Sequence, residues 1–361
     1  MRVVISAGGT GGHIYPALAI VHKIQEKEPN SEFLYIGTHN RMEKDIVPKE
    51  GIPFRSIEVY GFNRKQLWKN FKVIHCLYKS KKQCVKWLKE FKPDIVIGVG
   101  GYVTVPVLSA AHKLGIKTFL HEQNSVPGKA NLSLAFHTDL IGVSFQSSMD
   151  SFPVKKTIFT GNPCSEDALK KTPMKKSELG LDDKKKLVLI VMGSLGATSV
   201  NEILKKTLPL VEKEPYQFLF VTGKNDYEEI LNCAFPKNVK VVPYIDNMTR
   251  IMKNTDLMIT RAGASTLSEI MSLQIPSILI PSPYVPNNHQ YKNAMDLVSE
   301  NAALIIEEKD LTPEILIQKM KEVLTSREKQ EQMKKNLSKM GVPNSATLIY
   351  QEIQKLIEGK R

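Results

Sequence analysis

Short apolar runs and amphipathic stretches alternate along the first half of the chain. The runs have the length and the branched side chains of buried strands, and the stretches between them repeat apolar positions with helical spacing. Strands are predicted at residues 2–6, 33–38, 54–59, 94–99, 118–120, 140–144 and 157–160. A β-α-β-α-β order is typical of a parallel, doubly wound sheet, so this half predicts an α/β domain.

The same alternation begins again after a polar, lysine-rich connection at residues 164–186. Strands are predicted there at residues 186–192, 218–222, 240–242, 257–260 and 277–281. The end of the chain is charged and helical, and its last amphipathic segment, 348–357, could cross back onto the first domain. We therefore expect two domains, residues 1–162 and 163–344, with residues 345–361 packed on the first.

A glycine-rich turn follows the first predicted strand. Gly8, Gly9, Gly11 and Gly12 remove the Cβ atoms that would keep a ligand away from the backbone. The turn leads into a helix, whose first N–H groups and positive dipole end attract an anion. His13, at the start of this helix, is the side chain of the turn that can move a proton near neutral pH.

Comparable segments follow other predicted strands. Residues 193–197 repeat the strand–turn–helix order, and residues 121–124 form a polar cluster where ligands of open α/β sheets bind. Residues 261–270 place hydroxyl groups and Glu269 in the first turns of a helix. This last segment is either an anion site with a carboxylate for a sugar diol or an ordinary capped surface helix.

Other nucleotide-binding motifs are absent from the sequence. The first turn does not match G-x-G-x-x-G, and the second strand ends in Gly37-Thr38 without a carboxylate, which disfavours a dehydrogenase. Neither a G-K-[ST] P-loop nor a G-x-S-x-G elbow occurs. Asp-x-Asp pairs and clusters with metal-ligand spacing are also missing, so helix ends and backbone amides would have to hold a pyrophosphate.

The net charge of +13 is concentrated in residues 64–92, where ten lysines and arginines accompany one acid, Glu90. Apolar residues recur there with helical spacing, and Trp68 and Trp87 lie beside them. The segment is either a packing helix with a solvated lysine face or a basic, aromatic surface on anionic lipid headgroups. A nucleic-acid groove is disfavoured, because no stacking aromatics alternate with arginines and no binding motif appears.

Cysteine usage and the absence of long apolar runs indicate a cytoplasmic protein. Cys76, Cys84, Cys164 and Cys233 form no C-x-x-C pair, which is typical of reduced thiols. We expect no signal peptide, because the first residues lead directly into a strand. No apolar run approaches the roughly 18 residues that span a bilayer.

Eight segments together resemble the MurG family of peptidoglycan N-acetylglucosaminyltransferases, in the family's order and over nearly the whole chain. They are Gly8-Gly9-Thr10-Gly11-Gly12-His13, Gly100-Gly101-Tyr102-Val103, His121-Glu122-Gln123-Asn124, Gly161-Asn162-Pro163, Gly193-Ser194-Leu195-Gly196-Ala197, Arg261-Ala262-Gly263-Ala264, Ser268-Glu269 and His289-Gln290-Tyr291. The resemblance implies the GT-B fold, with two Rossmann-like, doubly wound parallel-sheet domains that face each other across a cleft.

The resemblance also implies an activity. Members of this family transfer N-acetylglucosamine from UDP-GlcNAc, with inversion, to the C4 hydroxyl of MurNAc in undecaprenyl-diphosphate-MurNAc-pentapeptide, converting lipid I to lipid II. The implied setting is the cytoplasmic face of the cell membrane, where the protein is peripheral, contacts an anionic surface and serves cell-wall synthesis, cell shape and division. Other cell-wall and division proteins are implied as partners, nucleic acid is not, and no metal cofactor is expected.

The family's functional residues can be carried over position by position. His13 is implied as the catalytic base, with Glu122 as the alternative. The residues implied to bind UDP-GlcNAc are Thr10, Gly11, Gly12, Asn124, Ser194, Ile245, Ala264, Ser265, Thr266, Glu269 and Gln290. Gly9, Gly101 and Tyr102 would form the acceptor-side loops. The membrane contacts would be Trp68, Phe71, Lys72, Ile74 and Lys79.

One departure from the family affects the charge at the diphosphate. Ser165 stands where many relatives carry an arginine, so one cationic contact is either missing or supplied from elsewhere, with Lys170 and Arg261 as the candidates. Two other classes of protein remain open: a GT-B enzyme with a different acceptor, and a non-catalytic binder of sugar nucleotides. The basic aromatic segment favours a lipid acceptor over a soluble one, and His13 together with Glu269 disfavours the non-catalytic class.

Overall fold

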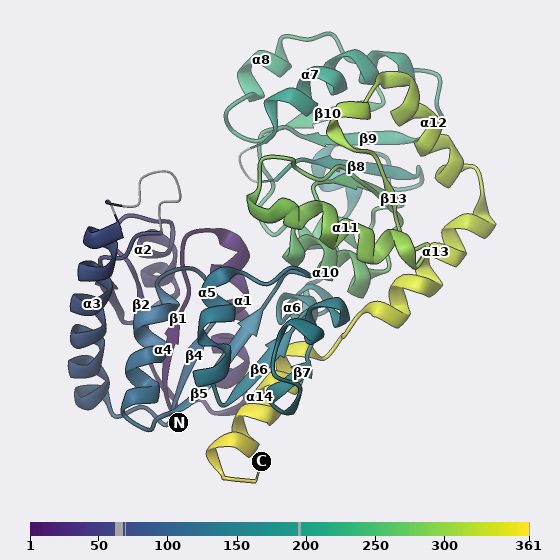
Figure 1. Ribbon diagram of the computed structural model, residues 1–361. Coiled ribbons are helices and arrows are strands. Elements are labelled where there is room, and N and C mark those ends of the chain that lie inside the picture. The colour runs from purple at the N-terminus through teal and green to yellow at the C-terminus, as the bar shows by residue number, and fades with distance from the viewer. Residues whose placement is uncertain (62–67, 69, 194–195, 361) are drawn as a thin grey trace. The chain divides into compact units, whose positions relative to one another are not determined.

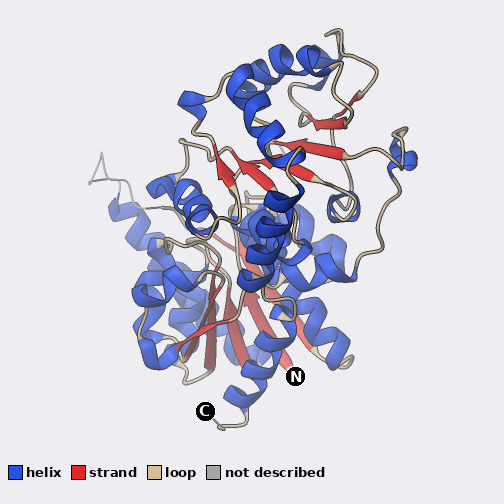
Figure 2. Ribbon diagram, turned by 90° about the vertical axis from the view of Figure 1, so that its right-hand side faces the viewer, coloured by secondary structure: helices blue, strands red, loops and turns tan. Residues whose placement is uncertain are grey.

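The strands of the chain form two separate parallel sheets. A computed structural model describes residues 1–61, 68, 70–193 and 196–360. Contacts divide the chain into a first unit, Met1–Glu166 with Asn344–Arg361, and a second unit, Asp167–Pro343. Each unit contains one of the sheets, and helices cover the sheet faces (Figures 1 and 2). The expected α/β class, with two doubly wound parallel sheets, is confirmed.

The sheet of the first unit has the order β3-β2-β1-β4-β5-β6-β7. Its strands are β1 (Arg2–Ser6), β2 (Glu32–Thr38), β3 (Phe54–Ile57), β4 (Ile95–Gly98), β5 (Lys117–Glu122), β6 (Leu140–Val143) and β7 (Thr157–Phe159). Strand β1 pairs in parallel with both β2 and β4, so the order of strands reverses direction between β1 and β4. Loops that leave the carboxyl ends of two such strands diverge and create a binding position at the sheet edge.

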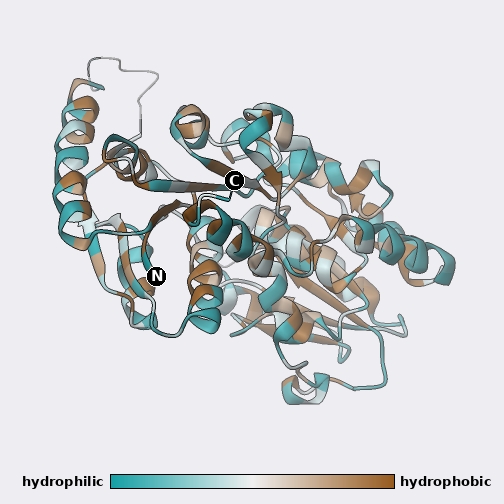
Figure 3. Ribbon diagram, turned by 90° about the horizontal axis from the view of Figure 1, so that it is seen from below, coloured by the Kyte–Doolittle hydropathy of each residue, from teal (hydrophilic) through white to brown (hydrophobic). Residues whose placement is uncertain are grey.

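The helices of the first unit connect these strands. They are α1 (Gly11–Lys27), α2 (Glu43–Ile46), α3 (Asn70–Phe91), α4 (Thr104–Lys113), α5 (Lys129–Leu134), α6 (Cys164–Lys170) and α14 (Ser345–Ile357), with 3-10 helices η1 (Val47–Glu50), η3 (Ala135–His137), η4 (Gln146–Ser151) and η5 (Val154–Lys156). Helix α6 begins in the first unit and ends in the second. The central strands are buried on both faces, which explains their continuous apolar sequence (Figure 3).

The C-terminal helix α14 packs within the first unit. Ile349, Ile353 and Leu356 share a buried apolar core with residues of β1 and α1. The Ser345 hydroxyl donates to the carbonyl of Asn162 at 2.6 Å, which ties the start of α14 to the end of the first sheet. Apolar burial and this hydrogen bond therefore both hold the end of the chain on the first sheet.

The sheet of the second unit has the order β10-β9-β8-β11-β12-β13 and reverses direction between β8 and β11. Its strands are β8 (Leu187–Val191), β9 (Gln217–Val221), β10 (Val239–Val242), β11 (Leu257–Thr260), β12 (Ser277–Leu279) and β13 (Leu304–Ile305). Its helices are α7 (Thr198–Thr207), α8 (Tyr227–Leu231), α9 (Thr249–Met252), α10 (Ala264–Leu273), α11 (His289–Ser299), α12 (Pro313–Leu324) and α13 (Arg327–Met340), with 3-10 helices η6 (Lys176–Leu179), η7 (Leu208–Val211), η8 (Pro286–Asn288) and η9 (Glu308–Asp310).

Two elements differ from the sequence prediction. Strand β13 was not predicted, because a two-residue strand is too short to show a period. The sequence also predicts a short helix at residues 41–47; the helix begins at Glu43 and continues as a 3-10 helix after Ile46, with Pro48 at the start of that tighter turn. Part of the basic segment, residues 62–67 and 69, lies outside the described residues.

Candidate active site

The glycine loops of the first unit meet at its switch point. The Gly8 amide donates to the carbonyl of Gly100 at 3.2 Å, which joins the loops after β1 and β4. Gly101 has φ +89°, and a Cβ atom there would lie 2.5 Å from the Gly8 carbonyl oxygen. Only glycine fits that close approach of two backbones. The structure therefore brings together two of the predicted acceptor-side segments.

A buried carboxylate holds the first loop in shape. Glu43 is fully buried; its Oε2 accepts a hydrogen bond from the Gly9 amide at 3.1 Å. Its Oε1 accepts from the amide and the hydroxyl of Thr38, at 3.0 and 2.6 Å. Glu43 was not predicted from the sequence, because an acid in a short polar stretch carries no signal that it will be buried. These bonds fix the turn that precedes His13.

His13 lies in the first turn of α1 and is half-buried. Its Nδ1 is 3.1 Å from the carbonyl oxygen of Gly8. A carbonyl can only accept, so in the neutral ring this contact places the proton on Nδ1 and the lone pair on Nε2. A Cβ atom at Gly100 would lie 2.6 Å from Cδ2 of His13, so the backbone of Gly100 also fixes the ring. In this tautomer Nε2 carries the lone pair with which a general base accepts a proton.

The Glu122 carboxylate, at the end of β5, is saturated by neighbouring donors. Oε1 accepts from the backbone amide of Asn124 at 2.9 Å and from its side chain at 3.3 Å. Oε2 accepts from the amide of Gly128 at 2.9 Å and from the side chain of Asn131 at 2.8 Å. A carboxylate with these partners shapes the loop that carries Asn124. Of the two candidate bases, the geometry favours His13.

His121 connects two of the predicted segments. It is fully buried, its Nε2 lies 3.0 Å from the Gly161 carbonyl and its Nδ1 lies 3.0 Å from Nε2 of Gln123. Because a carbonyl accepts and an amide NH₂ donates, the proton is on Nε2 of a neutral ring. Burial lowers the pKa of His121 to about 4, against the smaller effect of the bond to Gly161. His121 is therefore a neutral structural link in the sheet edge.

The second glycine loop follows β8. Gly196 has φ +80°, and a Cβ atom there would lie 2.3 Å from the carbonyl oxygen of Thr222. The Asn201 side chain donates to that same carbonyl at 3.1 Å and to Asp226 at 2.7 Å. The loop is therefore packed against the end of β9. Ser194, predicted to contact the diphosphate, lies outside the described residues.

The N-terminus of α10 leaves two side-chain groups available to a ligand. Gly263 precedes the helix in an extended conformation, and the Ser265 hydroxyl is buried without a hydrogen-bond partner among the described residues. Glu269 is one turn further along the same face and is partly buried. Burial raises the pKa of its carboxyl to about 7. Because buried oxygen atoms normally have hydrogen-bond partners, these two groups are suited to form hydrogen bonds with a ligand.

Four other predicted residues lie near strand ends of this unit. Ala264 and Thr266 lie in the first turn of α10. Ile245 is 6% exposed and follows β10. Gln290 lies in the first turn of α11, where its Oε1 accepts from the Ser282 amide at 2.8 Å. These four residues therefore lie in a loop and in first helical turns that follow strands of the second sheet.

Arg261, one of the two cations considered as a replacement at Ser165, is paired with an acid. Arg261 is 9% exposed; its guanidinium forms an ion pair with Glu308 at 2.7 Å and donates to the Ile280 carbonyl at 3.1 Å. The other Glu308 oxygen accepts from the Ser199 hydroxyl at 2.6 Å. Arg261 therefore already has an acidic partner in Glu308. Glu308 was not predicted, because its partners are distant in the sequence.

Helix α3 presents an exposed apolar row. Phe71, Ile74 and Tyr78 are 78%, 54% and 71% exposed, and Trp68, just before the helix, is 69% exposed. The predicted membrane contacts Lys72 and Lys79 are also exposed. Val73, Cys76, Ser80, Cys84 and Leu88 form the buried face. The helix therefore packs on the domain through one face and presents aromatic and basic groups on another.

Neither a metal cluster nor a spanning helix is found in the described part of the chain. There, no three His, Cys, Asp or Glu side chains are grouped so that they could hold a metal ion. Among the same residues, no helix combines the length and the apolar character needed to cross a bilayer.

Two domain profiles match the chain. The glycosyltransferase family 28 N-terminal domain matches residues 3–141, and the family 28 C-terminal domain matches residues 187–349. Together with two parallel sheets and a glycine loop at each switch point, they define the chain as a GT-B glycosyltransferase.

The chain belongs to the family of UDP-N-acetylglucosamine--N-acetylmuramyl-(pentapeptide) pyrophosphoryl-undecaprenol N-acetylglucosamine transferases, the MurG family. The Bacillus cereus transferase 1 is 44% identical over 99% of this chain and 100% of its own length. The Pediococcus pentosaceus transferase is 44% identical over 97% of this chain and 98% of its own. The crystal structure of Acinetobacter baumannii MurG superposes with a TM-score of 0.80 at 29% identity, over 98% of this chain and 99% of that one. The resemblance seen in the sequence motifs is confirmed.

Proposed function

We propose that this chain transfers N-acetylglucosamine from UDP-GlcNAc to the MurNAc sugar of undecaprenyl-diphosphate-MurNAc-pentapeptide, converting lipid I to lipid II in peptidoglycan synthesis. The observation that carries this proposal is the match of 99% of the chain, at 44% identity, to a relative named for this transfer. The site geometry supports it. In the first unit His13 lies at the end of a glycine loop, and in the second unit Ser265 and Glu269, near the N-terminus of α10, have oxygen atoms without hydrogen-bond partners among the described residues.

The donor is assigned to the second unit. The first amides of α10, with Ala264, Ser265 and Thr266, bind the diphosphate in this proposal, because a helix N-terminus favours an anion. The Glu269 carboxylate accepts hydrogen bonds from the ribose hydroxyls in this proposal. These hydroxyls are the donors that its partly buried carboxyl lacks in the free protein. The backbone of Ile245 binds the uracil edge, and the loop that contains Ser194 completes the phosphate site.

The sugar of the donor is assigned to residues from both units. Gln290 binds its hydroxyls through the side-chain amide group, whose oxygen is oriented by the Ser282 amide. Thr10, Gly11, Gly12 and Asn124 contact the same sugar nucleotide in this proposal. The loop of Asn124 has the shape that Glu122 imposes on it.

The acceptor is assigned to the first unit, with its diphosphate at the loops of Gly9, Gly101 and Tyr102. The acceptor C4 oxygen bonds to the anomeric carbon while the bond from that carbon to UDP breaks on the opposite face. Nε2 of His13 takes the hydroxyl proton, and UDP leaves with the bonding electrons. Amides and the dipole of α10 stabilise the departing diphosphate, so the proposed reaction needs no metal.

We assign the membrane contact to α3 and to Trp68 just before it. An acceptor with a long lipid chain stays in the bilayer, so the enzyme has to act at the membrane surface. Trp68, Phe71 and Ile74 would enter the interface, and Lys72 and Lys79 would face anionic headgroups on the cytoplasmic side. Co-sedimentation with neutral and anionic vesicles tests this. Equal binding of wild type and Lys72→Glu/Lys79→Glu to both kinds of vesicle would contradict it.

The function is tested with radiolabelled UDP-GlcNAc and a lipid I analogue in the presence of EDTA. Label should appear in the disaccharide product without added divalent metal. A reaction without acceptor and a reaction with an unrelated glycolipid serve as controls. Transfer to the unrelated glycolipid alone would overturn the assigned acceptor, and a strict need for a divalent ion would overturn the metal-free mechanism.

A further inference from the structure

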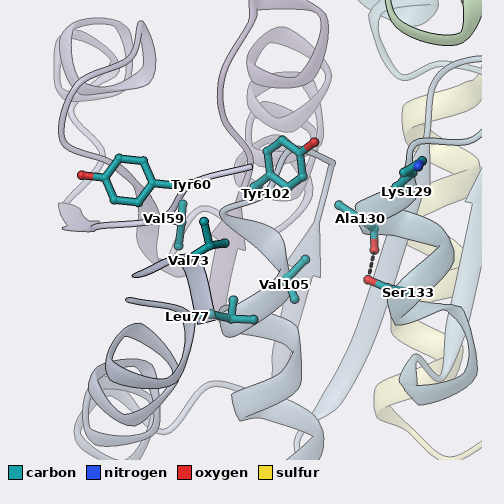
Figure 4. Close-up of a pocket in the computed structure, with 9 residues that line it drawn as sticks. All are labelled: Val59, Tyr60, Val73, Leu77, Tyr102, Val105, Lys129, Ala130 and Ser133. Atoms are coloured by element: carbon teal, nitrogen blue, oxygen red, sulfur yellow. Dashed lines mark hydrogen bonds between the residues drawn. The ribbon is translucent and has the colours of Figure 1, made fainter. Parts of the chain in front are cut away.

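An apolar pocket opens beside the acceptor-side loop of the first unit, between α3, α4 and α5 (Figure 4). Its volume is about 250 Å³. Its aliphatic lining consists of Val59, Val73, Leu77, Val105 and Ala130. Ligand pockets commonly have volumes of about 300–1,000 Å³, so this one suits a short apolar segment rather than a whole lipid chain.

Tyr102 joins this pocket to the glycine loops. Its ring lines the pocket and is half exposed, and it directly follows Gly101, which packs on the carbonyl of Gly8. A Cβ atom at Gly61 would lie 2.8 Å from the Tyr102 ring, so backbone packs closely against one part of that ring. The pocket therefore begins one residue away from the backbone assigned to the acceptor diphosphate.

The surroundings of the pocket are cationic on one side and apolar on another. Lys129 is the charged residue of the lining, and Figure 4 shows it on the α5 side, across from Val73 and Leu77. Val73 and Leu77 belong to α3, whose exposed apolar row begins with Phe71 and continues to Tyr78. An anionic group at the loops and a hydrocarbon attached to it would both find complementary surfaces here.

We infer that this pocket binds the first isoprenoid units of the acceptor's lipid, next to its diphosphate. The inference rests on the proposed function, because it concerns the substrate of that same site. The hydrocarbon bonded to a diphosphate held at Gly101 must leave along an adjacent surface, and the pocket lined by Tyr102 and Val105 provides an apolar surface there. The rest of the chain continues over the exposed row of α3 toward the bilayer.

Binding of geranyl diphosphate and of inorganic diphosphate to the full chain tests the pocket without any transfer reaction. One buried methylene is worth about fourfold in affinity, so a pocket that takes even a few carbons should favour geranyl diphosphate by roughly tenfold or more. Calorimetric titration measures both affinities. Equal affinities would overturn the inference.

Two matched variants on α5 locate the binding site. Ser133 lines the pocket and is exposed, so Ser133→Phe places a ring in its opening and should abolish the preference for geranyl diphosphate. Leu132 is 40% exposed and outside the lining, so Leu132→Phe should retain it. If Ser133→Phe folds poorly, Ala130→Leu serves instead. It fills part of the pocket with a smaller side chain and should reduce the preference for geranyl diphosphate. Loss of the preference in Leu132→Phe alone would place the hydrocarbon elsewhere.

Transfer assays separate failure of the pocket from failure of the function. Two lipid I analogues that differ only in a geranyl or an ethyl chain should differ in KM by roughly tenfold with wild type, and much less with Ser133→Phe. Transfer to both analogues with equal KM would overturn the pocket and leave the function standing. Absence of transfer to either analogue would overturn the function on which the inference rests.

Discussion

The carboxylates of Glu43 and Glu122 in the first unit and of Glu269 in the second have contrasting surroundings. In the first unit, Glu43 accepts from Gly9 and Thr38, and Glu122 accepts from Asn124, Gly128 and Asn131. In the second unit, Glu269 has no hydrogen bond or ion pair with any described residue, and burial raises its pKa to about 7.

This difference separates a loop shaped by the protein from a site completed by a ligand. Carboxylates that accept from several N–H donors stabilise the backbone of the loops that carry those donors. A partly buried carboxyl without donors costs stability until a ligand supplies hydroxyl groups. The first unit is therefore expected to present backbone and His13 in a fixed arrangement, whereas the second gains contacts on binding UDP.

The largest expected effect is on the base. His13→Ala should lower kcat by about 10²–10⁴-fold, because the acceptor hydroxyl loses its proton acceptor. UDP affinity should stay within about twofold, since the proposed contacts to the uracil, the ribose and the diphosphate are in the other unit. Initial-rate kinetics and calorimetric titration of UDP measure the two effects. Unimpaired turnover would exclude His13 as the base, and Glu122 would then be the next candidate.

The same substitution in each unit tests the contrast directly. Glu122→Gln should destabilise the first unit by about 2 kcal/mol, because a Gln NH₂ would face N–H donors that now bind a carboxylate. Both tryptophans, Trp68 and Trp87, belong to the first unit, so tryptophan fluorescence during urea unfolding follows that unit. Glu269→Gln should leave this transition in place.

For UDP binding the two variants should rank in the opposite order, with Glu269→Gln having the larger effect. Glu269→Gln should weaken UDP binding by roughly tenfold or more, because the ribose hydroxyls lose a charged acceptor. Glu122→Gln should change UDP affinity much less. Equal losses of UDP affinity in both variants would mean that the two carboxylates have the same role.

The pH dependences of the two units should be opposite. His121 has its pKa lowered from 6.5 to about 4 by burial, so its contribution to stability is present above pH 6.5 and is lost as pH falls toward 4. Glu269 has its pKa raised from 4.5 to about 7, so the second unit loses stability as pH rises through that window. Hydrogen exchange of β5 and β8 amides at several pH values distinguishes the units.

UDP affinity should increase with pH as Glu269 ionises, whereas the stability of the second unit should decrease. The ionised carboxylate is the form that accepts the ribose hydroxyls, so affinity should fall as pH drops below about 7. Glu269→Gln should flatten this profile. An unchanged profile in the variant would assign the titration to another group, such as the phosphate.

The smallest effect is expected at Ser265. Its hydroxyl has no hydrogen-bond partner in the described residues, so Ser265→Ala should leave stability within about 0.5 kcal/mol of wild type. UDP affinity should fall roughly threefold to tenfold if this hydroxyl binds a phosphate. Thr207→Ala is the matched control, because the Thr207 hydroxyl is already bonded to the Ile203 carbonyl. It should affect stability more than UDP binding.

Much of the fold could be predicted because its signals are local. Buried parallel strands appear as apolar runs such as residues 187–191, and turns against a second backbone require glycine, as at Gly101 and Gly196. The two-residue strand β13 was missed, because it has no period of its own and exists through pairing with β12. The proposed roles of His13 and Glu269 came from a resemblance, and they remain to be tested.

The sequence by itself determined the two doubly wound sheets, the glycine turns and the place of His13 at a helix start, because each depends on neighbouring residues. Only the tertiary structure decided which acids are paired. Glu43 accepts a hydrogen bond from Gly9, 34 positions away, and Glu308 forms an ion pair with Arg261. Such pairings depend on which strand ends become neighbours in a sheet, and no local pattern of residues records that.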